Sequence, residues 1–181
     1  MEKTSAFKKP EHYIPDHYVI HGDNNFPNND YLPVLVYKQA FNPQEKKLAD
    51  IIEDTFNKNN WTNSWRNGIL EKHHYHSNTH EALGISAGHC KVQLGGPNGI
   101  VLDVEKGDVV ILPAGIAHRN VGCSKEFEVV GGYPGGIEHD MKYGKPDDRP
   151  AADENIRKVS LPETDPVYGY EGDLITFWMM Q

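Results

Sequence analysis

Between Trp61 and Tyr133, short apolar runs alternate with glycine-containing turns, and this pattern limits the fold more than any other feature of the chain. The runs cover residues 81–87, 90–94, 100–104, 109–112, 117–121 and 127–130. Apolar segments of this length, bounded by turn residues, are typical of strands. Because no strands alternate with helical segments here, we predict an all-β fold, either a closed antiparallel barrel or a sandwich.

The segments on either side differ in composition and predict three zones: 1–60, the core barrel 61–133, and an extension 134–181 that packs on the barrel. Residues 1–33 are polar and rich in turn residues, which predicts an arm without a core of its own. Residues 32–37 predict a strand. The extension is rich in Pro, Gly and Asp until the apolar segment 174–179, which predicts an edge strand.

A helix is predicted over about residues 43–58. Asn42 supplies an N-cap, Pro43 follows at the first helical position, and Glu45 comes three residues after the cap. Apolar residues at positions 48, 51, 52 and 56 give this helix one buried face.

Length and charge narrow the classes of function. A chain of 181 residues suits one domain. Its 18 Lys and Arg against 26 Asp and Glu give a net charge of −8 with no basic cluster longer than a pair, which disfavours nucleic acid as a partner. No apolar stretch reaches the ~18–20 residues of a membrane span. Residues 1–15 lack the apolar core of a signal peptide, so we expect a cytoplasmic protein without a membrane partner.

The chain has two cysteines, Cys90 and Cys123. They are too few for a disulfide scaffold and lack the CxxC spacing of redox or zinc motifs. We predict that both are reduced and at least partly buried, and a redox role is the less favoured alternative.

Residues 73–81, HHYHSNTHE, contain four of the ten histidines and a glutamate. If this segment is extended, His74 and His76 point to one face while His73 and Tyr75 point to the other. A His-x-His pair alone is more often two polar side chains on a wet strand face. Whether this pair binds a metal therefore has to be judged from the residues around it.

Two further side chains can join this histidine pair. Glu81 begins the next predicted strand after a short turn, and His118 stands three residues beyond the turn at Gly115. Three imidazoles and one carboxylate suit a divalent transition metal such as Fe, Mn, Ni, Co or Zn. A metal site built from His74, His76, Glu81 and His118 is therefore a candidate.

These residues fit two motifs of the cupin superfamily, which the chain resembles. The motif G-x5-HxH-x4-E-x6-G matches Gly68, His74, His76, Glu81 and Gly88, and G-x5-PxG-x2-H-x3-N matches Gly107, Pro113, Gly115 and His118. Nine of the ten fixed positions agree; Gly122 takes the place of the final asparagine, and Asn120 comes two residues early. The runs HYHSNTHEALG and ENIRKVSLPETDPVYG also resemble the YjlB-like bacterial cupins, a family without an assigned reaction.

The resemblance implies a jelly-roll β-barrel, a metal at its mouth bound by His74, His76, Glu81 and His118, and a homodimer. It implies no substrate, because cupins include dioxygenases, isomerases, lyases, storage proteins and sugar-binding regulators.

The residues near the motifs suggest how such a site would work. Asn120 shares a strand face with His118. Its amide could hydrogen-bond to a bound substrate or to an unpaired backbone group at the end of a neighbouring strand. His80 points away from Glu81 and is expected outside the ligand set, either bonding a ligand, lining the mouth or lying at the surface. The alternation from Glu81 sends residues 83, 85 and 87 inward, which predicts an apolar cavity floor.

We therefore predict a metal-dependent enzyme that acts on a small oxygen-bearing molecule by oxygenation or isomerisation. Four protein ligands leave one or two positions of the ion open, as a catalytic site needs. Two alternatives remain: a non-enzymatic module that binds or senses a small molecule ordered by the metal, and a metal-free, epimerase-like use of a histidine as base.

Overall fold

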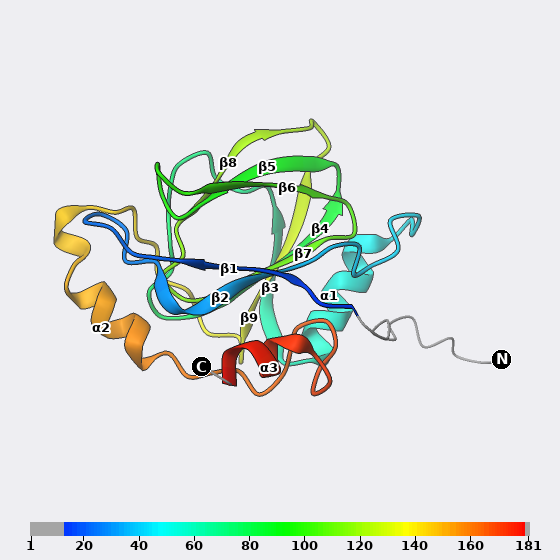
Figure 1. Cartoon of the computed structure of the whole chain (residues 1–181). Helices are drawn as coiled ribbons and strands as arrows, with labels where there is room; N and C mark the ends of the chain where they lie inside the picture. The colour runs from blue at the N-terminus through cyan, green and yellow to red at the C-terminus, as the bar shows by residue number, and fades with distance from the viewer. Residues whose placement is uncertain (1–12, 180–181) are drawn as a thin grey trace.

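Two antiparallel sheets face each other in the computed structural model, which describes residues 13–179 (Figure 1). The larger sheet has six strands in the order β1-β2-β7-β4-β9-β3, and the smaller sheet has the order β6-β5-β8. The strands are β1 (Asp16–Ile20), β2 (Asn29–Tyr37), β3 (Trp61–Asn67), β4 (Glu81–Ala87), β5 (His89–Leu94), β6 (Ile100–Glu105), β7 (Val109–Leu112), β8 (His118–Cys123) and β9 (Glu128–Pro134). Every pairing among them is antiparallel, so the predicted all-β, jelly-roll fold class is confirmed.

Three α-helices lie outside the barrel (Figure 1). Helix α1 (Leu48–Lys58) packs against β3, β4 and β9, and α3 (Asp173–Met179) contacts β2. Helix α2 (Ala151–Lys158) follows a short 3-10 turn, η1 (Pro146–Asp148). Helices α1 and α3 therefore cover the outer face of the larger sheet.

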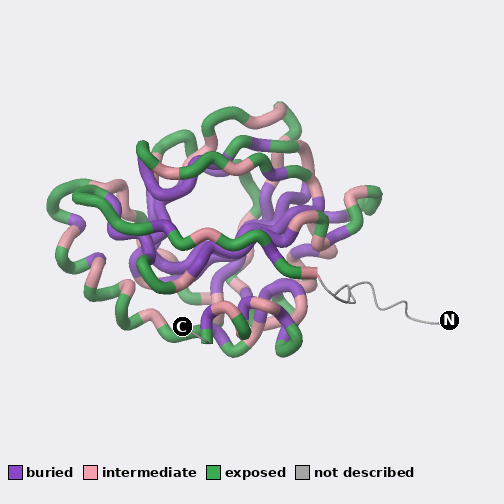
Figure 2. Tube along the Cα trace, in the orientation of Figure 1, coloured by how far each residue is buried: buried purple, intermediate pink, exposed green. Residues whose placement is uncertain are grey.

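Apolar side chains of the larger sheet are buried on both of its faces. Inward, they meet the smaller sheet, and outward, they meet α1 and α3. The inner cluster includes Val34, Val36, Leu83, Ile85, Val92 and Leu94. The outer cluster includes Leu35, Ile52, Phe56, Ala82, Ile111 and Trp178. Burial on both faces explains why β4 and β7 read as continuous apolar runs, and Figure 2 shows these strands buried while β1 and β6 are mostly exposed.

Gly84 allows α1 to approach the sheet. A Cβ atom at this position would lie 2.5 Å from Cγ2 of Ile52 and 3.2 Å from the Phe56 ring. Both side chains belong to the buried face of α1. A larger residue would therefore push the helix away from β4.

The segment predicted as an arm contributes two strands to the larger sheet. Strand β1 and the first half of β2 lie within residues 13–33, whereas residues 1–12 of the predicted arm lie outside the described residues. Strand β1 lies at the edge of the sheet and is mostly exposed. An exposed edge strand needs few apolar residues, and its sequence DHYVI therefore resembles a loop. The sheet thus extends beyond the predicted core range 61–133.

The helix predicted over 43–58 is present but begins at Leu48. Asn42 does not cap it; its Oδ1 accepts a hydrogen bond from the backbone N–H of Gln44, 3.0 Å away, within a turn. The predicted N-terminus is therefore wrong, because an Asn–Pro pair suits a turn as well as a helix start.

The closing segment 174–179 is not the predicted edge strand but part of α3. Leu174 and Trp178 are one helical turn apart, and both are buried in the outer cluster. The indole N–H of Trp178 also donates to the carbonyl of Pro33 at 2.9 Å. An apolar run this short does not show whether it repeats with the period of a strand or of a helix, and this explains why the sequence predicts a strand here.

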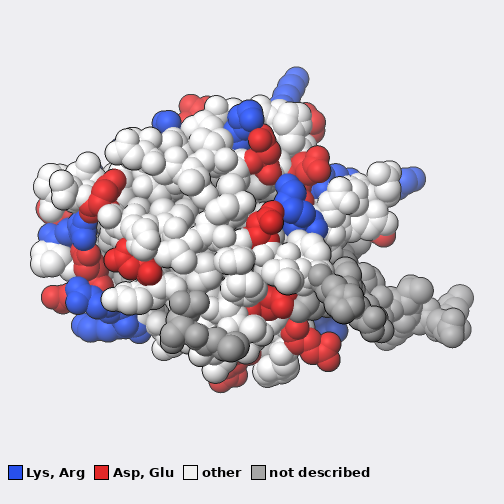
Figure 3. Space-filling view, viewed as in Figure 1, with Lys and Arg blue, Asp and Glu red and all other residues white. Residues whose placement is uncertain are grey.

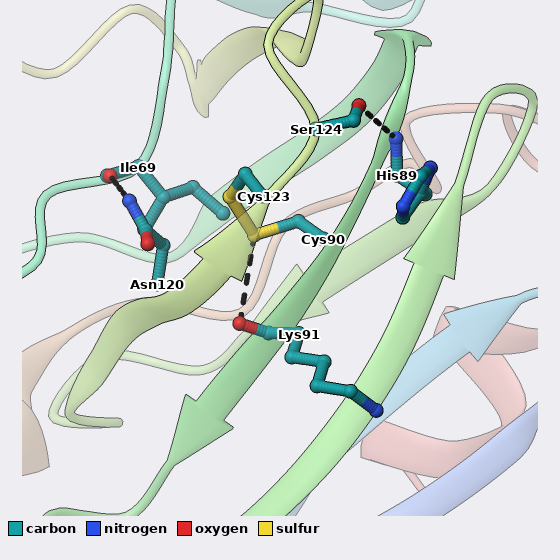
Figure 4. Close-up of a disulfide and its surroundings, with 7 residues drawn as sticks. All are labelled: Ile69, His89, Cys90, Lys91, Asn120, Cys123 and Ser124. Atoms are coloured by element: carbon teal, nitrogen blue, oxygen red, sulfur yellow. Dashed lines mark hydrogen bonds between the residues drawn. A yellow bond between two sulfur atoms is a disulfide. The ribbon is translucent and has the colours of Figure 1, made fainter.

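Cys90 and Cys123 form a disulfide between β5 and β8 (Figure 4), so the prediction that both are reduced is wrong. The two residues are 33 positions apart but become partners in the β5–β8 pairing, with their Cα atoms 4.0 Å apart. Cys90 is buried and Cys123 partly buried, as predicted. Their proximity depends on strand register, which cysteine counting does not show.

Charged side chains of both signs are interspersed on the face drawn in Figure 3. The ion pairs of the chain include Lys91 with Asp103 at 2.7 Å and Arg149 with Asp153 at 2.6 Å. Water and salt screen pairs at or near the surface, so the two apolar clusters dominate stability. Within residues 13–179, none of the helices combines the length and the apolar character that crossing a bilayer requires.

Candidate metal centre

The two sequence motifs meet at one end of the barrel. His74 and His76 lie on the segment between β3 and β4, Glu81 begins β4, and His118 begins β8. The backbones of His74 and His118 form two hydrogen bonds with each other, of 3.2 and 2.9 Å. The N–H of Gly115 donates to the carbonyl of His76 at 2.8 Å. Backbone pairing thus fixes the spacing between the motifs.

The four predicted ligands converge there, and all four are buried. One nitrogen from each of His74, His76 and His118 lies within 4.8 Å of the others. Oε2 of Glu81 lies 3.3 Å from Nε2 of His76 and 3.3 Å from Nε2 of His118.

Backbone carbonyls set the tautomer of all three imidazoles. The contacts from Nδ1 are His74 to Lys72 at 2.9 Å, His76 to Asp140 at 2.6 Å, and His118 to Ile116 at 3.0 Å. A carbonyl oxygen can only accept, so each Nδ1 carries the hydrogen and donates it. Each Nε2 therefore presents a lone pair to the centre, which is the form that binds a metal.

Electrostatics also prepare these residues for a cation. Oε2 of Glu81 is buried without a hydrogen-bond partner among residues 13–179. Although burial opposes it, protonated His76 and His118 would hold the pKa of Glu81 well below its usual value, and Glu81 in turn raises the pKa of His76 against the effect of burial. Burial, assisted by His118, lowers the pKa of His74 to about 3. An anionic oxygen and imidazole lone pairs directed at one point require a positive charge between them, so these residues fit a divalent metal ion.

The predicted alternation of the histidine segment is present. The rings of His73 and Tyr75 lie 5.6 and 6.2 Å from the ring of Phe26, away from the centre. Residues 74 and 75 form only isolated bridges, yet the segment is extended enough for neighbouring side chains to face opposite ways.

A cavity of about 280 Å³ opens onto the histidines. Its remaining walls are mainly apolar and include Trp65, Ile69, Leu70, Leu83, Tyr133, His139 and Met141. Of the predicted floor, Leu83 lines the cavity, whereas Ile85 lies in the inner cluster and Ala87 is half-buried. A larger hollow of about 470 Å³ lies between β2 and α2, away from the histidines.

Two cavity residues that the sequence analysis did not identify contact the ligand set. The hydroxyl of Tyr133 donates to Oε1 of Glu81 at 2.9 Å. The ring of His139 stacks on that of Tyr133 at 4.8 Å and lies 4.6 Å from the ring of His76. Tyr133 follows residues 129 and 131 on the inner face of β9, so extending the predicted strand 127–130 would have indicated it.

Asn120 contacts the cavity wall rather than the cavity. Its Nδ2 donates to the carbonyl of Ile69 at 2.7 Å (Figure 4), and its backbone N–H donates to the carbonyl of Leu70 at 2.9 Å. This contact corresponds to the second possibility raised for Asn120, that its amide hydrogen-bonds to the backbone of a neighbouring segment.

His80 directly precedes β4, and its side chain points away from that of Glu81, toward Trp178. Its Nδ1 accepts a hydrogen bond from the backbone N–H of Ala114 at 2.9 Å, and its ring lies 4.7 Å from that of Trp178. Burial lowers its pKa to about 4. His80 therefore supports the turn that precedes His118 and lies apart from the other histidines.

No family model matches the chain, but comparison with individual proteins finds relatives. The sequence is 36% identical to the uncharacterized protein YjlB of Bacillus subtilis over 168 residues, which cover 93% of this chain and 95% of YjlB.

Solved structures show more distant likenesses. Acireductone dioxygenase from Bacillus anthracis, solved with a cadmium ion in its active centre, has a TM-score of 0.38 and 16% identity, over 61% of this chain and 78% of its own. A protein with a double-stranded β-helix domain from Klebsiella pneumoniae has a TM-score of 0.35 and 18% identity, over 75% and 90%. These scores assign no activity to this chain. The match to YjlB spans nearly the whole of both proteins, and the chain therefore belongs to the YjlB family, with the cupin fold that its two motifs predicted.

Proposed function

We propose that the protein binds one divalent transition-metal ion through His74, His76, Glu81 and His118 and is an enzyme acting on a small oxygen-bearing molecule. The observation that carries this proposal is the buried Oε2 of Glu81, which lacks a hydrogen-bond partner among residues 13–179 and faces the Nε2 lone pairs of His76 and His118 at 3.3 Å. Unless a metal ion or a proton lies between them, these lone pairs and the Oε2 charge repel each other.

A bound ion would supply Lewis-acid or redox chemistry to a substrate oxygen. Four protein donors are fewer than the ligands that Fe, Mn, Co or Ni can accept, so room remains for substrate on the cavity side. An open position supports a catalytic role over a purely structural one.

The cavity walls favour a small substrate with one polar end. Trp65, Leu70, Leu83 and Met141 offer apolar contacts around a space of about 280 Å³. Arg66 also borders the cavity, but Asp50 and Glu53 already neutralise its charge. We therefore favour a molecule that binds the ion through oxygen and packs its carbon skeleton against these walls.

His139 is placed to contact such a substrate. It borders the cavity, and its Nδ1 is buried without a hydrogen-bond partner among the described residues. A substrate hydroxyl or carbonyl beside the metal could satisfy this nitrogen, depending on the tautomer. Asn120, in contrast, would act through the wall formed by Ile69 and Leu70.

Metal analysis tests the proposal. Protein purified without an affinity tag should carry close to one Fe, Mn, Co, Ni or Zn ion per chain, and His118→Ala should lose it. His73→Ala is the control, because His73 faces Phe26 rather than the centre. Absence of these metals, together with no uptake on reconstitution, would refute the site.

The reaction class needs a second measurement. The metal-loaded protein is offered small hydroxy acids, keto acids and sugars, and both oxygen uptake and product formation are followed. Turnover that His118→Ala abolishes supports an enzyme. Binding without turnover across the panel would instead support the alternative, a module that senses a small molecule through its metal.

A further inference from the structure

The two oxygens of Glu81 have different surroundings. Oε1 accepts a hydrogen bond from the hydroxyl of Tyr133 at 2.9 Å, whereas Oε2 faces the Nε2 atoms of His76 and His118. A carboxylate can only accept, so Tyr133 is the donor. One oxygen is thus occupied by the protein, and the other is directed at the centre.

Tyr133 is itself held in place. The indole N–H of Trp65 donates to the Tyr133 hydroxyl oxygen at 2.8 Å. Trp65 can lie there because Gly131 is its partner across the β3–β9 pairing, where a Cβ atom would come within 2.1 Å of the indole. The chain of donors from Trp65 through Tyr133 to Glu81 therefore depends on a glycine in β9.

We propose that Tyr133 is a positioning residue that restricts Glu81 to binding the metal through Oε2 alone. This inference rests on the proposed metal site and adds the binding mode of its only carboxylate. A glutamate has three side-chain torsions, and a free carboxylate could rotate so that both oxygens approach an ion. The Tyr133 hydrogen bond opposes that rotation, because it would leave a buried hydroxyl without its acceptor.

One-oxygen binding has a consequence for the substrate. If Glu81 used both oxygens, it would occupy one further position on the ion. By retaining Oε1, Tyr133 would leave that position free for another ligand when an ion is bound. The hydroxyl therefore helps determine whether a substrate can bind the ion through two oxygen atoms.

The test compares two tyrosines in Co²⁺-loaded protein. Tyr133→Phe removes the hydroxyl that reaches Glu81. The matched control, Tyr37→Phe, removes a buried hydroxyl that donates to a different carboxylate, that of Asp165, on the outer side of the sheet. Co²⁺ affinity is measured by titration, and the visible absorption of bound Co²⁺ reports its coordination.

We expect Tyr133→Phe to weaken Co²⁺ binding by about 10–100-fold, the usual effect of losing a partner of a metal ligand, and to change the absorption spectrum. Trp65→Phe, which keeps Tyr133 but removes its support, should cause a smaller change in the same direction. Tyr37→Phe should lower the unfolding midpoint while leaving affinity and spectrum unchanged.

The outcomes separate this inference from the proposed site. If Glu81→Ala loses Co²⁺ but Tyr133→Phe matches wild type in affinity and spectrum, the positioning role is wrong and the site stands. If Tyr37→Phe weakens Co²⁺ binding as much as Tyr133→Phe, the loss reflects general stability and the role is also wrong. If neither Glu81→Ala nor His118→Ala weakens binding, the proposed site itself is wrong.

Discussion

His80 and Glu81 are neighbours in the sequence, but their side chains point away from each other. We expect Glu81→Ala to abolish metal binding, since it removes the anionic donor at the centre. His80→Ala should weaken binding by no more than about 10–100-fold, because it acts only through the Ala114 turn. Metal content after gentle purification and Co²⁺ titration of both variants measure the difference. A His80→Ala protein without metal beside a Glu81→Ala protein that keeps it would indicate a site of four histidines.

The candidate ligands could be read from the sequence because each depends on short spacings. His74 and His76 are two apart in an extended segment, and His118 follows a turn marked by Pro113 and Gly115. The residues around Oε1 of Glu81 could be read only in part, because alternation along β9 places Tyr133 on the inner face but does not place it beside Glu81. Tyr133 reaches it only because β9 pairs with β4, and a register between distant strands leaves no local pattern.

The Cys90–Cys123 disulfide joins β5 to β8 and should stabilise the smaller sheet. Closing a loop of 33 residues predicts that its reduction costs about 3–4 kcal/mol of unfolding free energy, through the entropy of the unfolded chain. Urea unfolding with and without a reductant measures this cost. The double variant Cys90→Ser/Cys123→Ser is the control and should not respond to reductant. A wild-type midpoint that is also unaffected by reductant would show that the bond does not form in solution.

Strands of the barrel were easier to predict than the flanking elements for a physical reason. Strands β4 and β7 are buried on both faces, so their continuous apolar runs end abruptly at turn residues. Helix α3 is too short to show a helical period, and its burial depends on contacts with the outer cluster. The edge strand β1 is half solvated and lacks an apolar pattern. Tertiary contacts, rather than local sequence, decide the structure of α3 and β1, whereas the late start of α1 reflects the local turn at Asn42.

We predict that the molecule forms a homodimer, because the larger sheet has an edge that the described residues 13–179 leave unpaired. Leu174 and Trp178 of the closing segment pack in the chain's own outer cluster, so they do not contribute an interface. Within residues 13–179, the edge strand β1 pairs with β2 on one side only, and Val19 on it is 44% exposed. An exposed edge of this kind readily pairs with a second chain.

Light scattering at micromolar concentration should therefore give twice the mass of the 20.4 kDa chain. Val19→Lys should shift the protein toward the monomer, because a charge on the edge disfavours strand pairing, while leaving its metal content unchanged. Leu161→Lys is the control, since Leu161 is similarly exposed, at 41%, but lies outside the strands. A wild-type monomer would refute the dimer. A dimer that Val19→Lys leaves intact would place the contact elsewhere than β1.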